Sequence, residues 1–460
     1  MTTTHVGAAA TPATIGRSGV DYPRLLKPGW PLTALLALYP LWWVLGIGAF
    51  AFLLFSLPMA SYLFRHRPVR APAGFGLWLL FLLWSCGSLF MFPFNPPQAA
   101  AGTTAGRLLG IGLNEASYIA ATIVLLYLVN LPTYVLPQRR LLLLLSWLFA
   151  TTVAGGILGV VAPHFEFTAP VERLLPGVLR TNDYVRALVH PVAAQIQDVL
   201  GSQRPRPAAP FGYANFWGNN LSILLVWWIA FMWPGQLIRR RVLGIGVCVV
   251  ALVPVVHSLD RALWLGLVLS FVYLVLRVGP RHRRAGTALV LVAACAASIV
   301  AVSPLGSLVA RRAAHGESDD LRIYLTKAAF EDVRHSPILG YGGTRKTLGS
   351  NRSIAVGPSA NCSQCGSFGI GSNGQFWLVL FSQGFVGALL YTLFFLAAVV
   401  RHWPDASAVG VAGTLALVLS LAYMFFYTAL PSALILTMIS LGALVRNTSG
   451  GHHSSRRSGQ

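Results

Sequence analysis

Charged residues are scarce in this chain, which has only 13 Asp and Glu against 34 Lys and Arg. Charged residues make up 10% of the 460 positions, whereas soluble proteins carry about a quarter. Hydrophobic residues make up 55%, and the mean hydropathy is +0.65. The composition therefore excludes a soluble globular protein and predicts an integral membrane protein.

Cysteines and acidic pairs are also too few for the common metal sites. Cys362 and Cys365 form a single CxxC pair, whereas a zinc site needs a second pair, and no Asp-x-Asp motif is present. We therefore expect no metal and no cofactor. In an oxidising exterior the two cysteines are candidates for a disulfide, with free thiols as the alternative.

The chain begins without an apolar segment. Residues 1–28 lack the hydrophobic core of a cleavable signal peptide and are predicted to be a disordered cytoplasmic tail. Residues 447–460 are predicted to be a second one. The first transmembrane helix then serves as the targeting signal.

The long apolar runs predict an all-α, polytopic membrane protein with a single transmembrane domain, 29–446. One span needs about 20 residues, and about twelve spans fit the chain. They are two tight spans in 29–64, followed by spans at about 73–93, 108–130, 141–162, 214–233, 242–257, 262–277, 286–304 and 373–399, and a hairpin in 408–446. No internal repeat or separate soluble domain is visible.

The basic clusters agree with this topology. With twelve helices, the short clusters, such as Arg139–Arg140 and Arg239–Arg241, all lie on one side, which the positive-inside rule assigns to the cytoplasm. Both termini are then cytoplasmic, and two large loops, 163–210 and 305–372, face outward. The net charge of +21 is explained by orientation, so nucleic-acid binding is not predicted.

Several cations depart from this rule, because they lie in the predicted outer loops. Long loops are translocated largely regardless of charge, so each of these residues has an alternative reading as a solvated loop charge. That reading is weaker for Arg261, which is flanked by an apolar helix and needs a partner or a water-filled cavity. A guanidinium at this depth suits a bidentate phosphate contact.

Three stretches resemble the O-antigen ligase and polymerase superfamily of bacterial membrane glycosyltransferases. They are RPAAPFGYANFWGNN (206–220), SLDRALWLGLVLS (258–270), and LRIYLTKAAFEDVRHSPILGYGG (321–343) followed by GSNGQFWLVLFSQGFVG (371–387). The resemblance covers about 30–445 in topology and about 200–390 in motif.

The resemblance implies a C-type glycosyltransferase in the bacterial cytoplasmic membrane. Such an enzyme takes a glycan from an undecaprenyl-pyrophosphate carrier and joins it to a hydroxyl acceptor, a glycan or glycolipid, without a metal. Arg206, Arg261 and Arg322 occupy positions similar to the arginines that grip the pyrophosphate, whose developing charge needs fixed cations. Further candidates for substrate binding are Arg180, Arg204, Asn215, Arg334 and His257.

The chain departs from the family at the catalytic base. The ligases typically place His-Asn or His-Ser at the head of the return helix, eleven residues before a glycine. Counting back from Gly384 reaches Asn373, whose amide can orient a hydroxyl but cannot usefully accept its proton. His335 is the first candidate for a replacement base. His257 is the second, on the face of Arg261 if the helix extends that far.

Two other classes stay open at this point. Twelve helices also suit a lipid-linked glycan flippase or transporter, although no two-half symmetry is visible. The missing histidine leaves room for a catalytically silent membrane partner in polysaccharide assembly. The sequence also leaves open the sugar, the acceptor, and the choice between ligase and polymerase.

Overall fold

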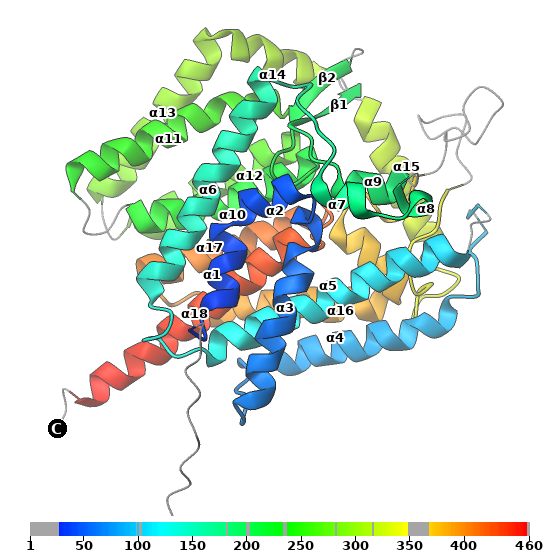
Figure 1. The fold of residues 1–460 in the computed structure, drawn as a ribbon. Helices are drawn as coiled ribbons and strands as arrows, with labels where there is room; N and C mark the ends of the chain where they lie inside the picture. Colours follow the sequence, from blue (N-terminus) through cyan, green and yellow to red (C-terminus); the bar gives the residue numbers. More distant parts are fainter. Residues whose placement is uncertain are drawn as a thin grey trace, which may run out of the picture.

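A computed structural model describes residues 27–97, 99–100, 104–180, 183–198, 203–232, 237–280, 283–314, 317–347 and 368–457. These residues form a mostly helical structure (Figure 1). The first half contains α1 (Trp30–Ala37), α2 (Tyr39–Leu45), α3 (Gly48–Arg65), α4 (Phe75–Ser88), the 3-10 helix η1 (Leu89–Met91), α5 (Thr104–Asn130), α6 (Gln138–Val161), α7 (Pro170–Leu174), α8 (Gly177–Arg180), α9 (Asp183–Val189), β1 (Ala194–Asp198), β2 (Gln203–Pro207) and α10 (Ala214–Met232). The second half contains α11 (Ile238–His257), α12 (Arg261–Val278), α13 (Arg283–Val302), α14 (Pro304–Ala314), α15 (Glu317–Val333), α16 (Gln375–His402), α17 (Ala408–Tyr423) and α18 (Ser432–Arg457).

Six helices in the described part of the chain are long and apolar enough to cross a membrane. They are α3, α5 from Arg107 onward, α6, α11, α12 and α16. A seventh is present if the sharply bent pair α13 and α14 counts as one broken span, and α4 with η1, α17 and α18 contain shorter apolar helices. The protein is therefore an integral membrane protein, as its composition predicts.

The helices fall where the apolar runs are, but their ends and breaks differ in two places. The run 29–64 forms three helices, because the chain breaks at Leu38 and at Gly46, whose φ of +81° ends α2. At the other end, α18 continues to Arg457, so 447–457 are helical where the sequence predicts a disordered tail. Elongating a formed helix is far less costly than nucleating a new one, which favours this extension.

Large aromatic side chains fill the core between the long helices. Trp78 of α4 is fully buried against Phe81, Tyr391 and Phe394, which joins α4 to α16. Trp217 of α10 is fully buried on α6, and its indole nitrogen donates to the Thr152 carbonyl at 2.9 Å. These contacts hold α4 against α16 and α10 against α6, and so they position the loops that follow these helices.

The segment between α6 and α10 folds into a small cap of its own. Helices α7, α8 and α9 and the β1–β2 hairpin lie toward the same end of the helix bundle (Figure 1). The two strands are antiparallel, with Gln195 opposite Arg206 and Gln197 opposite Arg204. The cap falls within the first predicted outer loop, 163–210, which therefore has ordered structure.

The glycine-rich stretch after α15 packs into a kink of α16. Gly384 interrupts α16 with a φ of +69°, and this break exposes carbonyl groups of the preceding turn. Tyr341 and Gly342 donate their backbone N–H groups to the carbonyls of Phe381 and Ser382, at 3.0 and 2.7 Å. Gly340 approaches the same turn so closely that a Cβ atom would lie 2.6 Å from the Phe381 carbonyl oxygen. The glycines of this motif are therefore explained by packing.

Candidate functional site

The buried guanidinium of Arg206 is the centre of the candidate site. Its Nε donates to the Ser258 carbonyl at 2.5 Å, and its Nη1 donates to Gln197 Oε1 at 2.6 Å. Its Nη2 donates to Asn215 Oδ1 at 3.1 Å and lies 3.7 Å from Asp260 Oδ2. Burial lowers the pKa of this guanidinium, and the Asp260 carboxylate opposes that shift. Arg206 thus joins the β-hairpin, α10 and the turn between α11 and α12.

That turn has a strained backbone, which two arginines hold. Leu259 has a φ of +52°, a left-handed conformation that is uncommon for a residue other than glycine and costs about 1–3 kcal/mol. Its carbonyl accepts a 3.0 Å hydrogen bond from Nε of the buried Arg312 in α14. The carbonyl of Ser258 accepts from Arg206. The hydrogen bonds from the two arginines therefore hold this turn, and the residues on either side of it, in a fixed position.

Asp260 caps α12 and brings a negative charge into the cluster. Its Oδ1 accepts from the backbone N–H groups of Ala262 and Leu263 at 3.2 and 3.4 Å, as expected of an N-cap aspartate. Its charge also helps burial to raise the pKa of Tyr427 well above the ordinary value, so that hydroxyl stays protonated. The cluster therefore has a neutral hydroxyl that can donate a hydrogen bond as well as cations.

Arg322 of α15 reaches the same place from the other side. Its Nη1 donates to the Phe426 carbonyl at 3.0 Å, one residue before Tyr427. Its charge contributes to lowering the pKa of Arg206, and Tyr427, which follows the carbonyl it bonds, is influenced by the charges of Asp260 and Arg206. The structure thus brings together Arg206, Arg322 and Asn215 among the sequence-predicted residues, and chain connectivity places Arg261 next to Asp260.

Asn373 lies beside α15, close to this cluster. Its Nδ2 donates to Thr326 Oγ1 at 2.8 Å, one helical turn after Arg322. Its Oδ1 is buried and has no hydrogen-bond partner among the described residues. Because buried polar atoms are normally paired, this oxygen is free to accept a hydrogen bond from a bound hydroxyl.

His257 and Arg261 flank the strained turn. The sequence places them on one face of a continuous helix if α11 extends that far, but α11 ends at His257 and α12 begins at Arg261, so the shared face does not form. Both side chains are half-buried, and His257 Nδ1 bonds the Val253 carbonyl at 3.0 Å.

Three other predicted residues lie farther out. Arg180 is exposed at the end of α8. Arg204 is half-buried on β2, two residues before Arg206. Arg334 is exposed after α15, with its guanidinium 4.9 Å from the centre of the Phe330 ring. No contact joins Arg180 or Arg334 to the cluster among the described residues, and their role in binding stays a prediction.

His335 lies in the turn after α15, and its side chain is exposed. Arg322 is separated from Val333, the last residue of α15, by eleven residues, or about 16 Å along the helix axis. The expected meeting of His335 with the arginines and Asn373 is therefore absent from this structure. The physical reason is that a straight helix holds its two ends apart. Its role as a base stays a prediction without geometric support.

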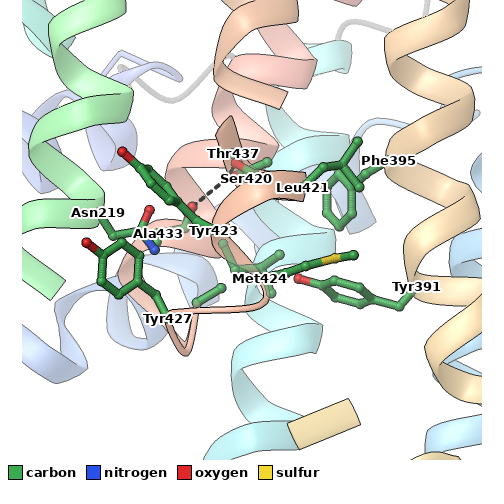
Figure 2. Close-up of a pocket in the computed structure, with 12 residues that line it drawn as sticks. Asn219, Tyr391, Phe395, Ser420, Leu421, Tyr423, Met424, Tyr427, Ala433 and Thr437 are labelled. Atoms are coloured by element: carbon green, nitrogen blue, oxygen red, sulfur yellow. Dashed lines mark hydrogen bonds between the residues drawn. The ribbon is translucent and has the colours of Figure 1, made fainter. Parts of the chain in front are cut away.

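A very small cavity lies beside the cluster, between α10, α16, α17 and α18. Figure 2 shows Asn219 beside the rings of Tyr423 and Tyr427, with Ser420 and Thr437 joined by a 2.7 Å hydrogen bond. The cavity volume of about 10 Å³ is room for one water molecule. It is too small for a substrate.

A larger cavity of about 270 Å³ lies between the cap and the helices. Its walls are mostly aromatic and aliphatic, and they come from α2, α3, α5, the end of α9, the segment 210–216 and the segment 428–432. His190, the residue after α9, is part of the wall. Its Nδ1 lies 2.8 Å from Glu172 Oε2, and its Nε2 lies 3.7 Å from Glu166 Oε2.

Sequence reasoning missed Asp260, Arg312 and the pair of His190 with Glu172. Asp260 could have been found, because an aspartate directly before an apolar helix is a capping signal. Arg312 and the pair could not, because their partners are 53 and 18 residues away in the chain.

Metal binding and the disulfide gain no support. No group of three or more His, Cys, Asp or Glu side chains in the described ranges could hold a metal ion. The carboxylates of Glu166 and Glu172 lie at opposite nitrogens of His190 and so do not converge. Cys362 and Cys365 lie outside the described residues. Cys86, Cys248 and Cys295 are free thiols on helices.

Comparison with known proteins gives one match. Residues 246–361, about a quarter of the chain, match the family model described as O-Antigen ligase. The matched segment contains the second half of α11, the strained turn, α12 and α15 with Arg322. It confirms the resemblance to the O-antigen ligase and polymerase superfamily. A search of curated proteins found no match.

Proposed function

We propose that this membrane protein, which carries the O-antigen ligase family segment, is a glycosyltransferase that uses a lipid-linked donor. It moves a glycan from an undecaprenyl-pyrophosphate carrier to a hydroxyl acceptor, as either a ligase or a polysaccharide polymerase. The observation that carries the proposal is the set of arginine contacts around the strained turn. Arg206 holds the Ser258 carbonyl, α12 begins at Arg261, and Arg322 bonds the carbonyl that precedes Tyr427. The departing pyrophosphate is an anion, and fixed cations stabilise the charge that develops on it.

The three arginines have different roles in this proposal. Arg206 is nearly fully buried, and its hydrogen bonds all go to protein groups. It therefore positions the turn and contributes positive charge without contacting the phosphate. Arg322 and Arg261 are less buried and provide the N–H groups that contact phosphate oxygens. Asn373 accepts a hydrogen bond from a donor-sugar hydroxyl through its unpaired Oδ1. Charge neutralisation by arginine makes the reaction independent of metal.

We further propose that the site faces outward from the bacterial cytoplasmic membrane. About twelve membrane helices, with the loops 163–210 and 305–372 outside, keep both termini and the short basic clusters in the cytoplasm. The cap of α7–α9, β1 and β2 then covers the outer end of the bundle, where the carrier presents its pyrophosphate.

The test is a transfer assay with the purified full chain in liposomes. The donor is polyprenyl-pyrophosphate-linked glycan extracted from the host, which is also the acceptor in the polymerase arm; a host glycolipid is the acceptor in the ligase arm. We expect a longer or transferred glycan together with released polyprenyl pyrophosphate. Movement of the donor across the bilayer without release would identify a flippase. If neither movement nor release is observed, the protein is a catalytically silent partner in polysaccharide assembly.

A further inference from the structure

We propose that His190, oriented by Glu172, is the general base of the transfer reaction, and that the 270 Å³ cavity beside it receives the acceptor hydroxyl. This inference rests on the proposed function, and it assigns the role that the histidine missing at Asn373 leaves open. His190 lies in the cap, outside the segment that matches the family.

The hydrogen bonds of His190 fix one tautomer of its ring. Glu172 is buried in α7, and its carboxylate accepts from His190 Nδ1 at 2.8 Å, so Nδ1 carries the proton. Nε2 is then the nitrogen with a lone pair. It is buried and has no hydrogen-bond partner in the described part of the chain, and the side chain is only 11% exposed. A carboxylate that orients a histidine in this way is the arrangement that prepares an imidazole to take a proton.

A second carboxylate stabilises the product of that proton transfer. Glu166 Oε2 lies 3.7 Å from Nε2, too far for a hydrogen bond but close enough for an ion pair once the ring is protonated. Glu166 is mostly exposed, with a side chain that is 60% accessible. It therefore offers a route by which the proton leaves toward water.

The cavity has the size and the lining of a site for part of a sugar or glycolipid. Its volume of about 270 Å³ approaches the lower end of small-molecule pockets, about 300 Å³, so it holds one group and not a whole glycan. Trp43, Tyr213 and Phe216 provide aromatic surface, while Asn114 and Ser117 of α5 add polar groups. Such a mixture of rings and a few polar groups fits a hydroxyl-bearing ligand.

Two chain segments connect this cavity to the arginine cluster. Asn215, which accepts from Arg206, lies between Tyr213 and Phe216, both of which line the cavity. Thr428 also lines it, two residues after the carbonyl that accepts from Arg322. The same two short stretches of chain therefore contribute both to the cavity lining and to the arginine cluster.

The other candidate histidines lack these features. His335 is exposed at the far end of α15, and His257 lines neither of the two cavities described above. The Nδ1 of His257 bonds a backbone carbonyl, so no carboxylate orients it through that atom. The pair of His190 and Glu172 is the better placed base.

The proposed step balances without a co-reactant. The acceptor oxygen forms a bond to the anomeric carbon of the donor glycan, while its proton passes to His190 Nε2. The bond between the anomeric carbon and the pyrophosphate oxygen breaks, and its electron pair leaves with the carrier pyrophosphate. The imidazolium then returns its proton to water, so the enzyme ends the cycle unchanged.

The test substitutes asparagine for single histidines in the liposome transfer assay. Asparagine Nδ2 can replace imidazole Nδ1 as the donor to Glu172, so His190→Asn keeps the structural hydrogen bond and removes the base. We expect turnover to fall about 10²–10⁴-fold, while binding of the polyprenyl-pyrophosphate donor is retained. The matched control is His164→Asn, an exposed histidine of the same loop, which should stay within about twofold of the unaltered chain. His257→Asn and His335→Asn test the other two candidate bases in the same assay.

A second variant tests Glu172 as a positioning residue. Glu172→Gln should lower kcat and leave the KM for the donor unchanged, because an amide no longer selects the tautomer. Free imidazole should restore part of the activity of His190→Ala, which a purely structural histidine would not allow. Full activity of His190→Asn beside an active unaltered chain would overturn the base and leave the proposed function intact, as would loss confined to His257→Asn or His335→Asn. An inactive unaltered chain would overturn both.

Discussion

The hydrogen bonds of each arginine in the cluster determine its role, and Arg322 is the one that is placed to contact the substrate. Arg206 donates to Ser258, Gln197 and Asn215 through three N–H groups, whereas Arg322 makes one hydrogen bond within the described part of the chain, to the Phe426 carbonyl. A guanidinium with N–H groups to spare can hold a phosphate in two places.

The first residue-scale prediction concerns Arg322. Arg322→Ala should lower kcat/KM for the lipid-linked donor about 10²–10³-fold, because charge stabilisation of the leaving group is lost. Arg322→Lys should recover only part of it, since an ammonium cannot make the bidentate contact. Lys327→Ala, an exposed cation on the same helix, is the control and should have little effect. An equal loss of kcat/KM in the Arg322 and Lys327 variants would mean that positive charge on α15 attracts the donor without a specific contact.

Arg345 illustrates a cation with a structural role. It is 2% exposed, and it donates to the carbonyls of Phe92, Phe94, Tyr341, Gly343 and Thr344 and to the Asn95 side chain. Burial is the main reason that the pKa of Arg345 falls to about 10, and it remains charged at neutral pH. Its hydrogen bonds fasten the loop after α4 to the glycine-rich stretch after α15.

Loss of the Arg345 side chain should destabilise the protein without changing the arginine cluster. Arg345→Met should lower the free energy of unfolding by about 3–5 kcal/mol, because several buried carbonyls lose their donor at once. The measurement is thermal unfolding of the purified protein in detergent, with Lys346→Met at the exposed neighbour as control. An unchanged melting temperature for Arg345→Met would contradict this assignment.

At the scale of elements, the kink of α16 is the device that receives the stretch 337–343. The break at Gly384 frees the carbonyls of Phe381 and Ser382 for Tyr341 and Gly342, and the Phe385 N–H donates to the Pro337 carbonyl at 2.8 Å. The same return helix begins two residues after Asn373. The kink therefore connects the packing of α15 to the placement of the cluster.

Substitution at the kink should be costly even though it adds a single methyl group. Gly384→Ala places a side chain at a φ of +69°, which costs about 1–3 kcal/mol, and its Cβ would lie 2.6 Å from the Ile338 carbonyl carbon. Gly110→Ala in α5 is the control, because a Cβ there meets no atom within 4 Å and should stabilise the helix by about 0.5–1 kcal/mol. Melting temperatures should move in opposite directions; a shift of the same sign in both would contradict the strained kink.

At the scale of the whole molecule, the cap and the arginine cluster lie at the same end of the helix bundle. The β-hairpin carries Arg206, and the turn that it holds joins the adjacent ends of α11 and α12. The carrier pyrophosphate lies at a membrane surface, so the orientation of this end decides which surface supplies the donor.

Accessibility labelling tests that orientation. In a chain without its native cysteines, Arg180→Cys in the cap and Lys346→Cys after α15 should react with a membrane-impermeant maleimide in intact cells. Arg239→Cys, at an exposed position that begins α11, should react only after permeabilisation. The reverse pattern would place the cluster in the cytoplasm and remove the proposed outer-face reaction.

The sequence by itself determined the class of protein, the approximate positions of most helices and the resemblance to a family. Long apolar runs are unstable in water, and in lipid their backbone N–H and C=O groups must form hydrogen bonds within helices. Composition and run length therefore suffice to predict a membrane protein and where its helices lie. The contacts of Arg206 with Ser258, of Arg312 with Leu259 and of His190 with Glu172 were decided by the tertiary structure alone. These partners are 52, 53 and 18 residues apart, and only helix packing and the strained turn bring them together. His335 follows the far end of α15, where the rise of the helix places Val333 about 16 Å from Arg322 along the axis.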